Sequence, residues 1–287
     1  MRTTAITIRT ATPADAEACG EIAYRAFETL ADRHNFSRPY PSAEVATGLL
    51  SRVLANPGFY GVVSELDGRI VGSNFADRRS SIAGIGPITV DPEAQSRGIG
   101  RTLMQAALDH LTARKFAGIR LVQAAFNNHS LCLYATMGFQ VREPLSVMQG
   151  PTLNMSFSGR DVRPATEADT AACNILCRQA HGFDRGLELR EAVAAGREGC
   201  RAPGADQRNT TGVGFTAHAV VETNQDLKAL IGAAPSFAGP GFPLPTRNHE
   251  LFAWCLDNKL RLIMQMTLMT IGLYNEPCGA WLPSILM

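Results

Sequence analysis

The sequence lacks the marks of several protein classes. Its seven cysteines are scattered, odd in number and form no C-x-x-C pair. A disulfide framework or a zinc cage is therefore not expected, and a reducing compartment such as the cytoplasm fits better. The first residues, M-R-T-T-A-I-T-I-R, hold no apolar core of the kind that a secretory signal has.

Strong net charge and long apolar runs are also missing. The formal net charge is +1, so composition gives no reason to expect a nucleic-acid or anionic-membrane partner. The most apolar stretch, 260–274, contains Gln265 and threonines and is shorter than the roughly 20 residues of a membrane-spanning helix. What is present, 45% hydrophobic and 18% charged residues, predicts a soluble globular protein with a sizeable core.

Periodicity predicts an α/β unit in the first 150 residues, with a mixed, mostly antiparallel central sheet flanked by helices. Asp67-Gly68 marks a tight hairpin, and Gly138 marks the end of a helix. The segment 28–51 is expected to hold a short helix and a mobile loop. Strands are expected at 6–9, 60–66, 70–76, 81–90 and 119–126, and one more begins at 139. One helix is expected to begin at 12–13, and two others to span 99–111 and 130–137.

The second half begins as the first does. I-R-T-A-T-P-A-D-A-E-A-C, from Ile8, aligns without a gap with V-R-P-A-T-E-A-D-T-A-A-C, from Val162. Agreement of this density predicts an internal duplication. Two domains are expected, 1–150 and 160–287, with a linker near 150–159.

A glycine-rich turn carries the first chemical signal. Residues 95–100 read Q-S-R-G-I-G, after a predicted strand and before a predicted helix. A helix start presents N–H groups without internal acceptors, and glycines at 98 and 100 let a phosphate approach the backbone. Arg97 and Arg101 add side-chain donors. The turn predicts a pyrophosphate site, and a plain helix-opening turn is the alternative.

A second motif, N-N-H-S-L-C-L-Y-A-T-M-G-F at 127–139, lies downstream. Together the two motifs resemble those of the GNAT (Gcn5-related N-acetyltransferase) family, Q/R-x-x-G-x-G/A and an Asn followed by L-Y-x-x-x-G-F. The resemblance covers roughly residues 5–145 and implies the GNAT fold, with acetyl-CoA as acyl donor and no metal.

The resemblance also implies a role for each matching residue. The pantetheine arm would lie along Ile88, Thr89 and Val90, and the Val90 N–H would polarise the thioester carbonyl, a contribution of about 3 kcal/mol. Tyr134 would be the general acid that protonates the thiolate. Asn127 would touch CoA or simply cap the next helix. The pyrophosphate turn would be Gln95, Ser96, Arg97, Gly98, Ile99, Gly100, Arg101 and Thr102.

The function so implied is transfer of an acyl group to a primary amine on a small molecule or peptide. A non-catalytic acyl-CoA sensor on the same fold is the alternative, and a nucleotide-phosphate enzyme ranks last because no metal-binding carboxylate pattern is present. No general base is apparent, because the strand 81–90 carries no carboxylate. Glu28, Asp32, His34, Asp77 and Asp91 are weak candidates, and a chain of water molecules is another.

The second half is expected to be degenerate. Asn248 stands where Asn127 does, but Cys255 replaces Tyr134, Lys259 replaces Gly138, and no Q/R-x-x-G-x-G precedes them. This half resembles the inactive partner of tandem GNAT proteins and is expected to bind no CoA. Its segment 197–212 has almost no apolar residues and is predicted to be a poorly ordered loop.

Overall fold

The first half contains the predicted order of elements. The computed structural model describes residues 6–194, 201–203, 213–237 and 239–286. Its first half consists of β1 (Thr7–Thr10), α1 (Ala16–His34), α2 (Ala43–Ala55), β2 (Phe59–Leu66), β3 (Arg69–Asp77), β4 (Ile82–Val90), α3 (Ile99–Ala113), β5 (Gly118–Ala124), α4 (Asn128–Thr136) and β6 (Gln140–Gln149).

The second half is shorter and has less regular structure. It consists of β7 (Val162–Pro164), α5 (Thr170–His181), α6 (Gly186–Ala194), β8 (Arg201–Pro203), β9 (Ala219–Val221), α7 (Asn224–Ala233), β10 (Phe242–Pro245), α8 (His249–Asp257), β11 (Arg261–Gly272) and β12 (Ala280–Leu282). Most of the predicted loop 197–212 lies outside the described residues. Of that segment, β8 forms a short strand paired with β7.

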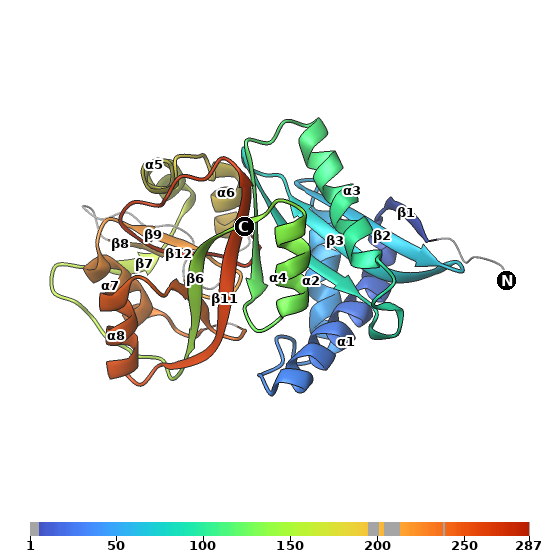
Figure 1. Cartoon of the computed structure of the whole chain (residues 1–287). Coiled ribbons are helices and arrows are strands. Elements are labelled where there is room, and N and C mark those ends of the chain that lie inside the picture. Colours follow the sequence, from blue (N-terminus) through green and yellow to red (C-terminus); the bar gives the residue numbers. More distant parts are fainter. Residues whose placement is uncertain (1–5, 195–200, 204–212, 238, 287) are drawn as a thin grey trace.

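One eight-stranded sheet runs through both halves, in the order β1-β2-β3-β4-β5-β11-β6-β10 (Figure 1). Only β4 and β5 pair in parallel, so the predicted mostly antiparallel sheet is confirmed. Buried side chains of α3 and α4 pack on one face of the first half, and those of α1 and α2 pack on the other.

Several local predictions are confirmed by backbone geometry. Asp67 and Gly68 have φ values of 53° and 76°, as a tight hairpin turn requires. Gly138 has φ 96° where α4 ends. The segment 28–51 holds more helix than predicted. Helix α1 continues to His34 and α2 begins at Ala43, which leaves only 35–42 as a loop.

The strand β11, from the second half, lies between β5 and β6 of the first half. It pairs with β5 from Met266 opposite Ala124 to Gly272 opposite Gly118. Displaced from β5, β6 pairs with β11 and with β10, so each half contributes a strand to the other's part of the sheet. In Figure 1 the two long strands run side by side through the middle of the molecule.

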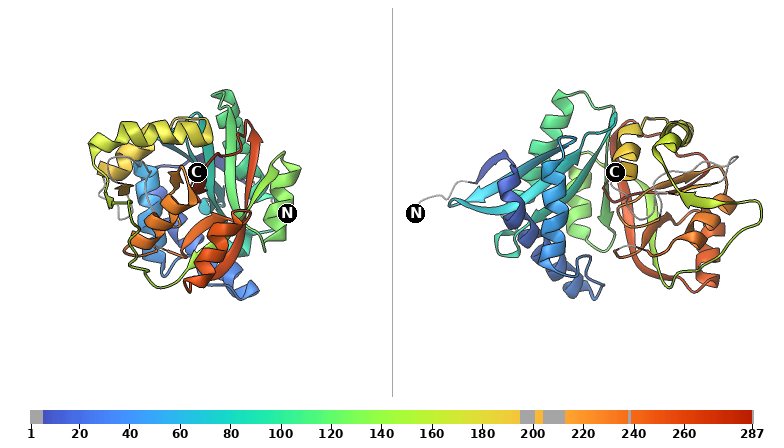
Figure 2. Two further views of the ribbon diagram at one scale, coloured as in Figure 1. Left: turned by 90° about the vertical axis from the view of Figure 1, so that its left-hand side faces the viewer. Right: turned by 180° about the vertical axis from the view of Figure 1, so that it is seen from behind.

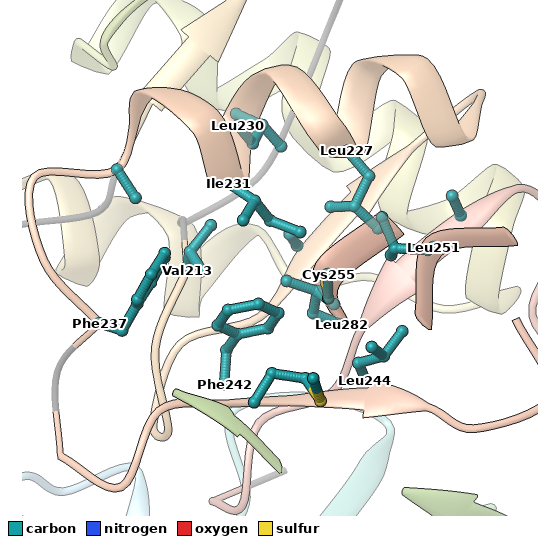
Figure 3. Packing of buried hydrophobic residues seen from close by; sticks show 14 of the residues in the cluster. Val213, Leu227, Leu230, Ile231, Phe237, Phe242, Leu244, Leu251, Cys255 and Leu282 are labelled. Carbon is teal, nitrogen blue, oxygen red and sulfur yellow. The ribbon is translucent and has the colours of Figure 1, made fainter. Parts of the chain in front are cut away.

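The hydrophobic core of the second half also uses the first half's last strand. Figure 3 shows Phe242 and Leu244 of β10 beneath Leu227 of α7 and Leu251 of α8. Met148 of β6 belongs to the same cluster. Seen from behind, α7 and α8 lie beyond the shared strands, on the side away from α1 and α2 (Figure 2). Helix α6 lies nearer, since its Glu191 accepts from Asn56 at the end of α2 at 3.0 Å. The halves are therefore joined by backbone pairing and by a common core.

Candidate functional site

The site is built where β4 leaves its neighbour β5. The two strands pair only between Ile82–Gly84 and Gly118–Arg120. A register shift follows, because Asn74 of β3 faces Ile88 while Ala76 faces Ile85, so β4 bulges at Gly86-Pro87. Within the described residues, the end of β4 then pairs with β3 alone, and its other edge carries unpaired backbone groups.

Backbone alternation shows which groups lie on that edge. The Asp91 N–H donates to the Val71 carbonyl at 2.9 Å, toward β3. Because successive N–H groups of a strand point to opposite sides, the N–H groups of Val90 and Ile88 point away from β3. The Gln95 side chain confirms the direction, since its Nε2 donates to the Val90 carbonyl at 3.2 Å. The predicted carbonyl-polarising group therefore lies on the unpaired edge.

The turn at 95–98 leads from this edge into α3. Ser96 and Gly98 have left-handed φ values of 64° and 80°. Helix α3 has no side-chain cap at Gly98 and no acidic residue in its first turn. A concave run of backbone N–H groups at the positive end of a helix is an anion site. Gln95, Ser96, Arg97, Gly98, Arg101 and Thr102 are all exposed, while Ile99 is buried.

Helix α4 closes the same site from a third side. A methyl group placed at Gly100 would lie 3.7 Å from Leu133 Cδ2 and 3.9 Å from Val90 Cγ2. Arg101 Nη2 donates to Thr136 Oγ1 at 2.8 Å, so α4 holds one of the two predicted phosphate donors. The end of β4, the start of α3 and the second motif therefore meet around Gly100.

The two named residues of the second motif have different surroundings. Asn127 Oδ1 accepts from the Ser130 N–H at 3.2 Å, so the capping role considered for this residue is observed. Tyr134 is 7% exposed and meets Phe139 edge-on, with ring centroids 6.1 Å apart. Burial raises the pKa of Tyr134 above its ordinary value, so the phenol is a neutral proton donor at physiological pH.

The four carboxylates considered as general bases are each engaged by an arginine. Asp91 is buried and pairs with Arg25 at 2.9 Å. His34 differs, because its ring is 5.1 Å from that of Phe126, beside the end of β5. The other pairs are Glu28 and Asp32 with Arg38, and Asp77 with Arg79.

In the second half, α7 precedes β10 and α8 as α3 precedes β5 and α4, and the start of α7 already holds a carboxylate. Thr223 caps α7, and the Asp226 carboxylate accepts from the Thr223 N–H at 3.1 Å and pairs with Arg160 at 2.8 Å. Asn248 caps α8 by accepting from the Leu251 N–H at 3.3 Å, as Asn127 caps α4. Cys255 is buried, and burial raises the pKa of its thiol to about 12, which disfavours a nucleophilic role.

Two other kinds of site were sought among the described residues. No group of three or more His, Cys, Asp or Glu side chains lies close enough together to hold a metal ion there. Every helix in that part of the chain falls short of the length or apolarity needed to cross a membrane.

Sequence reasoning missed one charged residue. Arg120 of β5 is 1% exposed, although strands seldom bury a guanidinium. In the sequence Arg120 is a polar residue within the strand segment I-R-L-V-Q. The rings that contact it, Phe183 and Tyr274, lie more than 60 residues away in the chain.

Comparison with known proteins points to one family. Residues 23–139, which include β4, the turn and α4, match the acetyltransferase (GNAT) family model. The mycothiol acetyltransferase of Tsukamurella paurometabola is 33% identical over 82 residues, 28% of each chain. That of Nocardia farcinica is 36% identical over 64 residues, 22% of this chain and 21% of its own. These matches span less than a third of the relatives' length.

Solved structures extend the likeness to nearly the whole chain. A Pyrococcus horikoshii protein, provisionally assigned as an acetyltransferase, has a TM-score of 0.78 over 98% of this chain and 94% of its own, at 18% identity. The GCN5-related N-acetyltransferase of Sphaerobacter thermophilus has a TM-score of 0.63 over 94% and 96%, at 14% identity. At identities this low, the two structural matches bear on the fold alone. They confirm the expected mixed α/β GNAT fold.

Proposed function

We propose that the chain is a GNAT-family N-acyltransferase that moves an acetyl group from acetyl-CoA to a primary amine. The observation that carries the proposal is the uncapped start of α3 beside the unpaired edge of β4. The start of α3 suits a diphosphate, and the edge of β4 suits the amide groups of a pantetheine arm. In CoA the pantetheine arm is attached to the diphosphate, so the two neighbouring features can bind one molecule.

The reaction proposed is a direct attack within a ternary complex. The amine nitrogen attacks the thioester carbon, and the Val90 N–H stabilises the oxyanion that forms. The C–S bond then breaks, and the departing thiolate takes the proton of the Tyr134 hydroxyl. The proton lost by the amine passes to water, and solvent reprotonates Tyr134, so the cycle closes without a metal.

The second half is proposed to be a degenerate copy that binds no CoA. The repeated opening segments support a common origin, because Arg163, Thr166 and Asp169 repeat the contacts of Arg9, Thr12 and Asp15 with nearly identical distances. The Asp226 carboxylate at the start of α7 supports the loss of binding, because it would repel a diphosphate.

Calorimetry and a thiol-release assay test the proposal. Isothermal titration of the full chain with CoA and acetyl-CoA should show one site per chain. Thiol release from acetyl-CoA should then depend on an amine chosen from amino acids, polyamines, peptide N-termini and mycothiol-related acceptors. Absence of any CoA binding to folded protein would rule out the enzyme, and two equivalent sites would rule out a degenerate second half.

An acyl-CoA sensor is the second candidate. The arginine partners of Glu28, Asp32, Asp77 and Asp91 favour it, because they leave no free carboxylate among the bases considered. Binding of acetyl-CoA without turnover of any amine in the panel would support the sensor. Amine-dependent thiol release would exclude it.

A further inference from the structure

The guanidinium of Arg120 is buried without a hydrogen-bond acceptor. The residue is 1% exposed, and Nε, Nη1 and Nη2 are all buried with no partner among the described residues. An arginine carries five N–H donors and stays charged across the physiological pH range. A buried charge of this kind is costly unless an acceptor satisfies it, so its environment calls for an anion.

The immediate neighbours of Arg120 are aromatic rings and a second cation. Its Cζ lies 4.6 Å from the ring centroid of Phe183 and 5.4 Å from that of Tyr274. The ring faces attract the positive charge of the guanidinium weakly. They offer no oxygen or nitrogen atom that could accept a hydrogen bond from its N–H groups. Burial and repulsion from Arg185 lower the pKa of Arg120 to about 10, so it is still charged at neutral pH.

The carboxylates of this region are already committed to other cations. Glu188 accepts from Arg185 Nε at 2.9 Å and Nη2 at 2.8 Å, and it lies 3.3 Å from His218 Nδ1. On the side of the first half, Arg79 binds Asp77 and also Glu191 of α6, the latter at 2.8 Å. Glu143 and Glu276, which lie near Tyr274, both pair with Arg247. None of these carboxylates accepts a hydrogen bond from Arg120.

Two more polar atoms in this aromatic cluster are buried and unpartnered among the described residues. These are the Tyr274 hydroxyl and His181 Nδ1. The His181 ring lies 5.6 Å from that of Phe183, the same ring that stacks on Arg120. Burial and the nearby Arg185 and Arg120 lower the pKa of His181 well below its ordinary value, so its ring is neutral and can donate one N–H. A cation and two neutral donors without acceptors suit a carboxylate.

We propose that Arg120, Tyr274 and His181 form an internal binding site for a carboxylate group. The three residues come from β5, from the segment after β11 and from the end of α5, so the site exists only where the two halves meet. Arg120 supplies the charge, and the other two fix the orientation of the carboxylate oxygens.

Register places this site in line with the proposed acyl-transfer site. Arg120 lies opposite Gly84 of β4, four residues before Ile88, which is roughly 10–13 Å along an extended strand. That distance is about the span of three to four extended peptide residues. The carboxylate is therefore either the far end of the acceptor, which rests on the proposed function, or a free small carboxylate.

The first experiment needs no enzymatic activity. Sodium acetate, and acetamide as its uncharged equivalent, are titrated into the full chain at low salt while the melting temperature is recorded. We expect acetate to raise the melting temperature by about 2 °C or more and acetamide to leave it unchanged. Arg120→Met should abolish the acetate shift. Arg142→Met is the matched control, because Arg142 also lies over Tyr274, at 5.2 Å, but has Thr270 and Gln140 as partners.

A second variant covers a failure of Arg120→Met to fold. Tyr274→Phe removes only the unpartnered hydroxyl, and should weaken acetate binding several-fold without a loss of stability. Acetate and acetamide acting alike on the wild type, or an acetate shift that survives in Arg120→Met, would overturn the proposal. Arg120 would then be a structural cation held by its two rings.

The second experiment separates the two sources of the carboxylate. Peptides of up to about four residues with a free carboxyl end are compared with their carboxamides as acceptors of acetyl groups. If the acceptor fills the site, kcat/KM should favour the free acid by roughly tenfold or more, and Arg120→Met should remove that preference. If kcat/KM does not favour the free acid but acetate still raises the melting temperature and acetamide does not, the site binds a free small carboxylate. No turnover of any peptide leaves the melting experiment as the deciding one.

Discussion

At the scale of single residues, the proposed chemistry depends on groups that the chain leaves unsatisfied. Among the described residues, the start of α3 has no side-chain acceptor, the Val90 N–H faces away from β3, and the Arg120 guanidinium has no hydrogen-bond acceptor. Folded proteins pair the great majority of buried polar groups, so unpaired ones mark positions where a ligand belongs. The buried phenol of Tyr134 is the general acid of the proposed reaction.

Removing the Tyr134 hydroxyl should separate binding from chemistry. In Tyr134→Phe the ring keeps its edge-on contact with Phe139, so the affinity for acetyl-CoA should not change. Thiol release should fall by roughly 100-fold or more, because general acid catalysis contributes about that much. Burial raises the pKa of this phenol, so the wild-type rate should show no loss of the acid form below about pH 10.

Tyr60→Phe serves as the matched control for that experiment. Tyr60 stacks on His110, near the far end of α3, and its hydroxyl has no place in the proposed reaction. The Tyr60→Phe enzyme should release thiol from acetyl-CoA at the wild-type rate. A Tyr134→Phe enzyme that also turns over at the wild-type rate would show that another group protonates the thiolate.

Gly98 and Gly68 form a natural pair for testing the diphosphate turn. Their φ values are 80° and 76°, and a methyl group added at either position meets no atom within 4 Å. Alanine should cost about 1–2 kcal/mol of stability at both positions, because an L-residue is strained in the left-handed region. Only Gly98→Ala should weaken CoA binding, since Gly68 lies in the β2–β3 hairpin. Urea unfolding and calorimetry measure the two effects, and equal CoA affinities would argue against the turn as the diphosphate site.

At the scale of elements, prediction succeeded where local chemistry decides the structure. The hairpin at Asp67-Gly68 and the helix end at Gly138 depend on backbone conformations that few residues adopt, so the sequence reveals them. The strand, turn and helix that carry the first motif were also predictable, because they are consecutive in the chain. Helix α2 is longer than the short helix expected in 28–51, with Ala46, Leu50 and Val53 on its buried face.

The segment that leads into α1 makes a prediction about pH. Asp15 is buried, accepts from the Thr12 N–H and pairs with Arg9, which together lower its pKa from 3.8 to about 2. A depressed carboxyl pKa stabilises the fold above about pH 4, and this contribution is lost as the pH falls toward 2. Asp15→Asn should therefore cost up to about 2 kcal/mol at pH 7 and progressively less below pH 4.

Urea unfolding of both proteins between pH 7 and pH 2 measures this difference. Asp169→Asn tests the corresponding position in the second half, where Arg163 lowers the pKa of Asp169 in the same direction. Its stability loss should shrink with falling pH in the same sense. A gap between wild type and Asp15→Asn that stays constant down to pH 2 would contradict the ion-pair explanation.

At the scale of the whole molecule, the sequence could not reveal which strands pair. Residues in β6 and β11 are equally suited to lie beside β5, since both are long and largely apolar on one side. In the fold, α5 and α6 pack against both strands, and β11 reaches β5 from more than 130 residues away in the sequence. The Arg120 cluster escaped prediction for the same reason, because Phe183 and Tyr274 reach it only through this arrangement.

The shared strands make a prediction about separated halves. Strands β6 and β11 pair antiparallel through Leu145–Met266, with Ser146–Gln265 and Pro144–Thr267 beside it. A fragment of residues 1–150 lacks β11, so the edge of β5 and the apolar side of β6 are left uncovered. Exposed strand edges promote association, so the fragment should form oligomers or aggregates and bind CoA poorly.

The matched control keeps both halves and cuts only the chain between them. Residues 151–159 are mostly exposed, so a protease site inserted there can be cleaved after folding. The nicked protein should elute from gel filtration as a single particle of unchanged size and bind CoA like the intact chain, because strand pairing and a common core hold it together. Halves that separate on cleavage, or a monomeric 1–150 fragment with full CoA affinity, would mean that the exchanged strands contribute little to the stability of either half.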